Sequence, residues 1–227
     1  MGKLEKLFGV KKPVIGMIHM GGMHQRDRMD IALEEMRVYE KEGVSGAIIE
    51  DYHCGILDEL IEVAAAIKKE KFNVIAGFNV LQNPSLSVML SDGYGGKFVQ
   101  YDSVWEKENW QTFGQFILGG VGFKYQPVTG NSLEYDLVEG MKRCDAIVTT
   151  GSGTGIETPV QKLKEYKKIM GDFPLIVGAG VNPDNAYEQS QIADGCIVGS
   201  CFKRGGDTRL MVDDILVREF MEKWRGS

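Results

Sequence analysis

Candidate anion-binding residues are clustered in the C-terminal third of the sequence, where glycines follow short apolar segments. They are Gly151, Gly153, Gly178, Gly180, Gly199 and Ser200. Backbone N–H groups that no side chain covers bind an anion such as phosphate when several of them point at one place. The segment GSGTG at 151–155 lacks the lysine of a P-loop, so it would be a flap or a second anion contact. The alternative is that these glycines only permit tight turns.

Three charged residues are the candidates for proton transfer. Glu50 follows three apolar residues, Asp102 follows the segment FVQY, and Lys124 lies between Phe123 and Tyr125. A carboxylate at a strand end can take a proton beside a carbonyl or bind a sugar hydroxyl. A lysine that points into a barrel is costly to desolvate unless it meets an anion, so Lys124 would contact substrate charge or act as a nucleophile. The alternatives are a salt bridge at the rim for an acid and an amine that reaches solvent for the lysine.

Polar residues at other strand ends are candidates for substrate binding. His19, Asn79 and Thr149 each follow an apolar segment, from which they could orient the hydroxyls of a sugar. His19 could also join His53 and Asp51 around a metal, but their spacing matches no dedicated metal motif. A lone histidine at a strand end is more often a structural residue. We therefore expect neither a metal nor a cofactor.

Short apolar segments that alternate with helical patterns would position these residues. The expected strands cover residues 14–19, 46–50, 73–79, 97–101, 121–125, 146–149, 175–177 and 196–198. The pairs Asn83-Pro84 and Asn182-Pro183 combine a capping side chain with a proline suited to the first helical position, so each is expected to start a helix. Thr158-Pro159 is expected to do the same. Residues 111–118 are expected to form at most a short helix.

The alternation of eight strands with helices favours an α/β protein built as one (β/α)8 TIM barrel over residues 1–227. In such a barrel the functional residues lie at the carboxyl ends of the strands, and the loops after strands seven and eight commonly hold a phosphate. An open, doubly wound sheet is the alternative, because alternation along the sequence does not prove closure.

The composition argues against some classes of binding partner. The net charge of −6 comes without any basic block, which argues against nucleic acid. No apolar run approaches the roughly 20 residues of a membrane helix, and the first residues lack the apolar core of a signal peptide. Four scattered cysteines indicate a reducing compartment. We expect a cytoplasmic protein with a small-molecule ligand and no integral membrane segment, and a homo-oligomer is left open.

Five segments resemble one protein family. They are KPVIGMIHM, GAIIEDYHCG, FNVL, IVTTGSGTG and GAGVNPDN with ADGCIVGSCFK, in this order. Together they are similar to the BtpA/SgcQ family, over nearly the whole chain. The resemblance implies a barrel of the ribulose-phosphate-binding type, and a lysine at position 124 shared with relatives. It also implies a link either to photosystem I assembly, as a peripheral membrane protein, or to sugar-phosphate metabolism.

Two functions from different classes follow. The first is an enzyme of isomerase, lyase or transferase type that acts on a phosphorylated sugar or a phosphoribosyl-type molecule, with Glu50, Lys124 and Asp102 as catalytic residues. The second is a non-enzymatic, BtpA-like assembly factor for a membrane complex. A third hypothesis is a catalytically inactive member of such a family that retains only the anion site.

Overall fold

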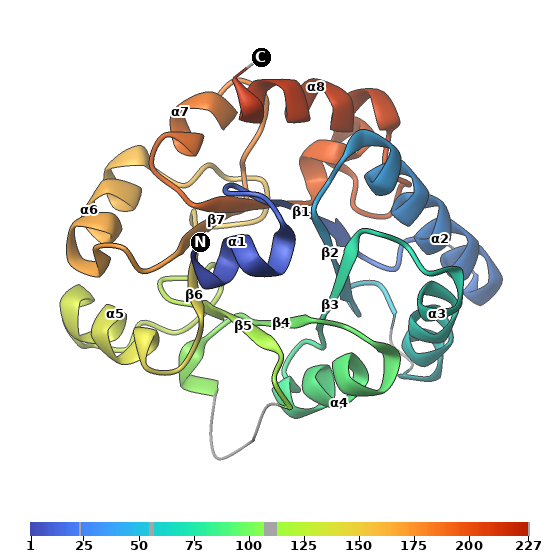
Figure 1. The fold of residues 1–227 in the computed structure, drawn as a ribbon, viewed down its shortest axis with the longest axis horizontal. Helices are drawn as coiled ribbons and strands as arrows, with labels where there is room; N and C mark the ends of the chain where they lie inside the picture. Colours follow the sequence, from blue (N-terminus) through green and yellow to red (C-terminus); the bar gives the residue numbers. More distant parts are fainter. Residues whose placement is uncertain (23, 55–56, 107–112, 227) are drawn as a thin grey trace.

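The described residues, 1–22, 24–54, 57–106 and 113–226 of a computed structural model, form eight parallel strands that close into a barrel (Figure 1). Each strand pairs with the next one in the sequence, and β8 pairs back with β1. The strands are β1 (Val14–Ile18), β2 (Gly46–Glu50), β3 (Ile75–Asn79), β4 (Phe98–Tyr101), β5 (Phe116–Gly120), β6 (Ala146–Thr150), β7 (Leu175–Gly178) and β8 (Gly195–Val198). The predicted (β/α)8 barrel is confirmed, and the pairing of β8 with β1 excludes an open sheet.

Within the described residues, seven helices surround the barrel on its outside (Figure 1). They are α2 (Gln25–Glu42), α3 (Leu57–Glu70), α4 (Pro84–Tyr94), α5 (Leu133–Met141), α6 (Val160–Met170), α7 (Ala186–Ser190) and α8 (Asp214–Arg225). A further helix, α1 (Lys3–Phe8), lies at one end of the barrel, and the 3-10 turns are η1 (Val104–Glu106), η2 (Ser200–Phe202) and η3 (Arg204–Gly206). Between β4 and β5 the described residues contain only η1. Of the described helices, none is long and apolar enough to cross a membrane.

The inside of the barrel is apolar toward the amino ends of the strands and polar toward their carboxyl ends. Side chains on a strand alternate between its two faces, so Ile48 and Glu50 of β2 share the inner face. Ile48 packs in an interior cluster with Met17, Val148 and other apolar side chains. The next inward positions line the mouth of the barrel, and those on β2, β3 and β6 are the polar residues Glu50, Asn79 and Thr150.

Helix α1, which the sequence analysis did not predict, closes the opposite end of the barrel. It lies across the barrel in the view of Figure 1, and its Leu4 and Phe8 belong to the interior cluster. The rings of Phe8 and Phe98 meet edge to face with centroids 5.4 Å apart. Glycines make room for them, because a Cβ on Gly77 would lie 2.4 Å from the Phe98 ring. The amino end is thus filled, and access to the interior is from the carboxyl ends.

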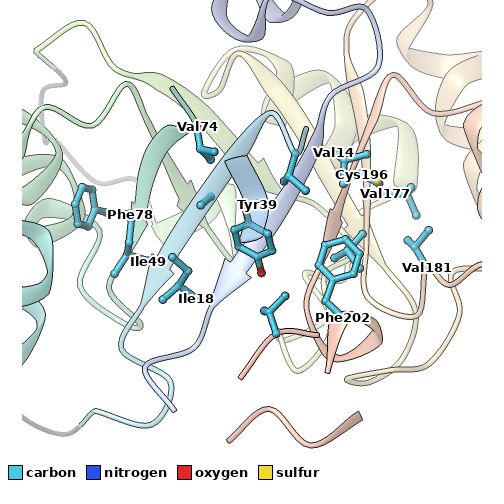
Figure 2. Close-up of a cluster of buried hydrophobic side chains, with 14 of the residues drawn as sticks. Val14, Ile18, Tyr39, Ile49, Val74, Phe78, Val177, Val181, Cys196 and Phe202 are labelled. Atoms are coloured by element: carbon cyan, nitrogen blue, oxygen red, sulfur yellow. The ribbon is translucent and has the colours of Figure 1, made fainter. Parts of the chain in front are cut away.

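A second apolar layer holds the helices against the strands (Figure 2). Tyr39 of α2 is its centre: the side chain is fully buried, lies near Ile18 and Phe202, and donates its hydroxyl to Met17 O at 2.8 Å. Gly16 leaves the space for this ring, since a Cβ there would lie 2.3 Å from it. Burying a large apolar side chain contributes about 1.5–3 kcal/mol each, so this layer fixes the strands that carry the polar mouth.

The fifth strand lies earlier than predicted. The expected strand at 121–125 is wrong, because β5 is Phe116–Gly120 and the residues after it form the loop to α5. The short helix expected within 111–118 is also wrong for residues 113–118, and residues 111 and 112 lie outside the described part. The sequence did not indicate this strand because Gly119 and Gly120 have a low propensity for β-structure. A Cβ on Gly120 would lie 2.0 Å from Asp102 O, so glycine is needed for the close approach of β5 to the end of β4.

Two of the three predicted helix starts are confirmed, but only one has the predicted cap. Asn83 caps α4, where its side chain accepts from Leu86 N and a proline follows at the first helical position. At Thr158-Pro159 a helix does begin, since α6 starts at Val160, but Thr158 donates its hydroxyl to Gly178 O at 3.1 Å and does not cap it. The prediction at Asn182 is wrong, because Asn182 folds a turn before α7, which begins only at Ala186.

Candidate functional site

A cavity of about 290 Å³ opens at the carboxyl ends of the strands. Most of the predicted site residues line it. Those in its wall are His19, Glu50, Asn79, Asp102, Lys124, Gly178, Gly180, Gly199 and Ser200. They come from β1 to β5 on one side and from the loops after β7 and β8 on the other. The fold therefore brings the predicted proton-transfer residues and the predicted anion-binding residues to one place.

Two carboxyl groups share one amide on the side formed by β2, β3 and β4. Asn79 Nδ2 donates to Glu50 Oε1 at 2.9 Å and to Asp102 Oδ1 at 3.2 Å. Gln100 Nε2 donates to the same Asp102 oxygen at 3.1 Å. We call these four residues the acidic side of the cavity. The amide hydrogens fix both carboxyl groups in place, so that both can face one ligand.

The acidic side holds a proton that an exposed carboxylate would lose. Burial, followed by the charge of Asp102, raises the pKa of Glu50 to about 8, although Lys124 and the bond from Asn79 oppose the shift. Burial also raises the pKa of Asp102, against the bonds from Gln100 and Asn79. Glu50 is therefore protonated near pH 7 and can donate a hydrogen bond or a proton. Two adjacent carboxyl groups, one of them protonated, can act as an acid and base pair when the other is ionised.

Lys124 lines the cavity from the loop after β5, not from within a strand as predicted. Its Nζ donates to Thr154 Oγ1 at 3.1 Å, and its backbone N–H donates to Thr150 Oγ1 at 2.6 Å. The predicted alternation with Phe123 and Tyr125 is thus not a strand pattern. The amine still reaches the cavity, because the loop turns back over the mouth; Tyr125 there has a φ of 62°.

His19 is a neutral part of the wall. Burial, together with the charge of Lys203, lowers its pKa to about 3. Its ring lies against Gly199, where a Cβ would come within 2.7 Å of Cε1. Asp51 accepts from Leu81 N at 2.8 Å, and His53 bonds Thr208 at 2.9 Å. Both side chains therefore form hydrogen bonds with loop residues, and neither lines the cavity. Among the described residues, no three His, Cys, Asp or Glu side chains gather to hold a metal.

The loops after β7 and β8 form the opposite wall, which we call the glycine side (Gly178–Val181 and Gly199–Cys201). Gly180 has a φ of 67°, and a Cβ there would lie 2.3 Å from Glu157 N. Packing therefore demands glycine at this position, as the turn-only alternative proposed. Within the described residues, the N–H groups of Gly180 and Ser200 donate to no other residue. Both groups remain available to a ligand.

Three predicted site residues lie outside the cavity wall. Thr149 is fully buried on the outer face of β6, with its hydroxyl toward Gly122 O at 3.5 Å, and its neighbour Thr150 lines the cavity instead. Gly151 and Gly153 also lie behind the wall. A Cβ on Gly151 would meet Ile156 O at 2.4 Å, so the start of this loop is shaped by its own packing.

Gln100, Thr150 and Thr154 line the cavity but were not predicted. The signal for Gln100 was present in the sequence, since it is a polar residue two positions before Asp102 in an otherwise apolar strand, and the two therefore share a face. Thr150 follows Thr149, and no pattern distinguished which of them faces inward. Thr154 is brought to the mouth by a loop whose path the sequence did not reveal.

A closed parallel barrel with a polar cavity at the carboxyl ends of its strands defines a TIM-barrel protein, and solved structures agree. N-(5'-phosphoribosyl)anthranilate isomerase from Pyrococcus furiosus matches with a TM-score of 0.62 at 17% identity, covering 95% of this chain and 100% of that one. 3-Hexulose-6-phosphate synthase from Salmonella typhimurium matches with a TM-score of 0.65 at 14% identity, covering 94% and 99%. At such low identities the likeness shows the fold alone.

Sequence comparison finds similarity to one family. Residues 126–226 match the model of the BtpA family. The chain is 26% identical to the putative sgc region protein SgcQ of Escherichia coli K12, covering 98% of each chain. It is 24% identical to the photosystem I biogenesis protein BtpA of Synechocystis, covering 96% of this chain and 90% of the relative. These matches confirm the resemblance to the BtpA/SgcQ family.

Proposed function

We propose that this protein is an enzyme that binds a phosphorylated sugar or a phosphoribosyl-type molecule and transfers a proton on it. The observation that carries the proposal is that the glycine side and the acidic side line the same cavity. The fold neighbours support it, because an isomerase of a phosphoribosyl compound and a hexulose phosphate synthase are built on this barrel. A phosphorylated substrate has a group for each side of the cavity.

The glycine side would bind the phosphate, and the acidic side would transfer the proton. The free N–H groups of Gly180 and Ser200 bind the phosphate, and Lys124 supplies a positive charge beside it. Glu50, protonated at neutral pH, donates a proton to the sugar, and Asp102 accepts one. Asn79 keeps both carboxyl groups oriented through the two bonds that it donates. The pairing of a proton donor with a proton acceptor suits an isomerase, lyase or transferase.

Substitution of Ser200 tests the phosphate position. Ser200 is partly exposed and lines the cavity, so Ser200→Asp places a carboxylate where the phosphate would bind and repels it. Ser200→Ala keeps the backbone N–H and is the matched control. We expect ribose 5-phosphate to raise the melting temperature of the wild type and of Ser200→Ala, and to leave that of Ser200→Asp unchanged. Equal shifts in all three proteins would contradict the phosphate position.

A second candidate function is a non-enzymatic assembly factor for a membrane complex. The observation that favours it is the relative from Synechocystis, which is named as a photosystem I biogenesis protein. Cellular complementation separates the two functions. An assembly factor should tolerate the substitutions Glu50→Gln and Lys124→Ala together, whereas an enzyme should lose its cellular role because both residues line the cavity.

A further inference from the structure

The acidic side brings two carboxyl groups together, and in the absence of a ligand Glu50 is kept neutral by a proton. Glu50 and Asp102 both line the cavity, and both are largely buried. Across the described residues, neither carboxyl group forms an ion pair with a lysine, arginine or histidine. Buried acids are normally paired with a cation or kept neutral by a proton. A ligand that brings a positive charge would complete this site.

The hydrogen-bond inventory shows which kind of group would fit. Asn79 Nδ2 has two hydrogens, and both are used, one by each carboxyl group. Gln100 Nε2 gives a hydrogen to Asp102. The second oxygens of the two carboxyl groups accept no bond from the described residues. What the acidic side lacks is a compact group with several donors.

Gln100 provides an independent observation that points the same way. Its side chain is 3% exposed and lines the same cavity, and its Oε1 is buried without a hydrogen-bond partner among the described residues. Which end of the amide is the oxygen is not in doubt, because exchanging the oxygen and the nitrogen would place the oxygen against Asp102. A buried acceptor without a donor is costly, at about 1–3 kcal/mol. A donor-rich ligand group beside Asp102 would relieve that cost once Gln100 adjusts to it.

Lys124 does not supply the group with several donors that the acidic side lacks. Its amine donates to Thr154 Oγ1 on the loop after β6, and it forms no ion pair with any described residue. The amine therefore stays with the loops that carry the phosphate in the proposed function. Positive charge at the loops and negative charge at the acidic side suit a ligand with opposite charges at its two ends.

We infer that the ligand carries a primary ammonium group, which the acidic side binds through Glu50, Asp102 and Gln100, so that the substrate class is an amino sugar phosphate or a similar phosphorylated amine. The inference rests on the proposed function, since the phosphate end is bound as described there. An ammonium group has three donors and a positive charge, which match the acceptors that remain. Bonds between charged partners are stronger than those to a neutral hydroxyl, so the amine should be favoured by about tenfold or more.

Calorimetric titration with two ligands tests the inference. Glucosamine 6-phosphate and glucose 6-phosphate carry the same phosphate and differ by an amine in place of one hydroxyl. Each is titrated into the wild-type protein with a chelator present, and again with Mg²⁺. We expect the amine to bind about tenfold more tightly in both conditions. A preference that needs Mg²⁺ would overturn the inference, because the acids would then hold a metal ion.

Two variants localise the preference. The double substitution Glu50→Gln and Asp102→Asn removes both carboxyl groups and keeps the shape, so it should abolish the preference. Asp51→Asn removes a charge from the neighbouring residue outside the cavity wall and keeps an acceptor for Leu81 N, so the preference should persist. Equal binding of both ligands by the wild type would overturn this inference alone. Binding of neither ligand would overturn the proposed function as well.

Discussion

The two sides of the cavity use different parts of the chain. On the acidic side the functional atoms are side-chain atoms, brought inward from β2, β3 and β4 and connected through Asn79. On the glycine side they are backbone N–H groups, and the path of the loops depends on missing side chains, as at Gly180. Both sides lie at the carboxyl ends of parallel strands, so they differ in the atoms that they present and not in their level along the barrel.

This difference predicts how each side responds to substitution. The acidic side is defined by charge, so a substitution that keeps shape should change its protonation and its ligand while leaving the fold intact. The glycine side is limited by space at Gly180 and Gly199, so one methyl group at either position should disturb the fold before it changes any chemistry. Substitutions on the two sides therefore separate chemistry from stability.

The largest effect is expected at Gly180. A Cβ there would overlap Glu157 N, and the positive φ is strained for any L-residue, so Gly180→Ala should lower the free energy of unfolding by about 4 kcal/mol. Gly130→Ala is the matched control, because Gly130 has a φ of 78° and no atom within 4 Å of its Cβ position. It should cost about 1 kcal/mol. Equal losses in denaturant titrations of the two variants would refute the steric account.

A smaller, pH-dependent effect is expected at Glu50. Its pKa is about 8 in the folded protein and 4.5 as a free side chain, so its contribution to stability is complete below pH 4.5 and is lost as the pH rises through 8. Glu50→Gln removes this loss. The variant should therefore gain about 2 kcal/mol on the wild type between pH 6 and pH 8, measured by urea unfolding. A constant difference across this range would show that Glu50 ionises normally.

The smallest effect is expected on β6, between the two sides. Thr150 Oγ1 accepts from Lys124 N and donates to Gly151 O, so Thr150→Val should cost about 1 kcal/mol and loosen the loop that carries Lys124. Thr149→Val is the control on the outer face, where the hydroxyl lies 3.5 Å from Gly122 O and meets the Tyr166 hydroxyl but does not bond Lys124. Chemical denaturation should show a smaller loss for Thr149→Val, and the reverse order would contradict the assignment of faces.

The acidic side could be predicted from the sequence more fully than the glycine side. Glu50, Asn79 and Asp102 each end an apolar segment, and the periodicity of two places such residues at the mouth of a barrel. The same periodicity did not resolve Thr149 from Thr150, because the predicted end of that strand was one residue short. For Gly151 and Gly153, composition suggested ligand contacts, but the loop path places them behind the wall.

Two parts of the fold could not be predicted because local patterns favoured something else. The segment 121–125 contains more β-forming residues than Phe116–Gly120, whose two terminal glycines fit the barrel only through contacts with residues distant in sequence, such as Asp102. Helix α1 is six residues long and has little stability of its own. It forms because Leu4 and Phe8 close the amino end of the barrel, and that opening exists only in the folded protein.

The most direct test is a crystal structure of the protein with ribose 5-phosphate. The account predicts the phosphate within hydrogen-bond distance of the N–H groups of Gly180 and Ser200, with the sugar hydroxyls turned toward Glu50 and Asp102. A phosphate bound at the acidic side, or outside the cavity that the two sides share, would contradict it.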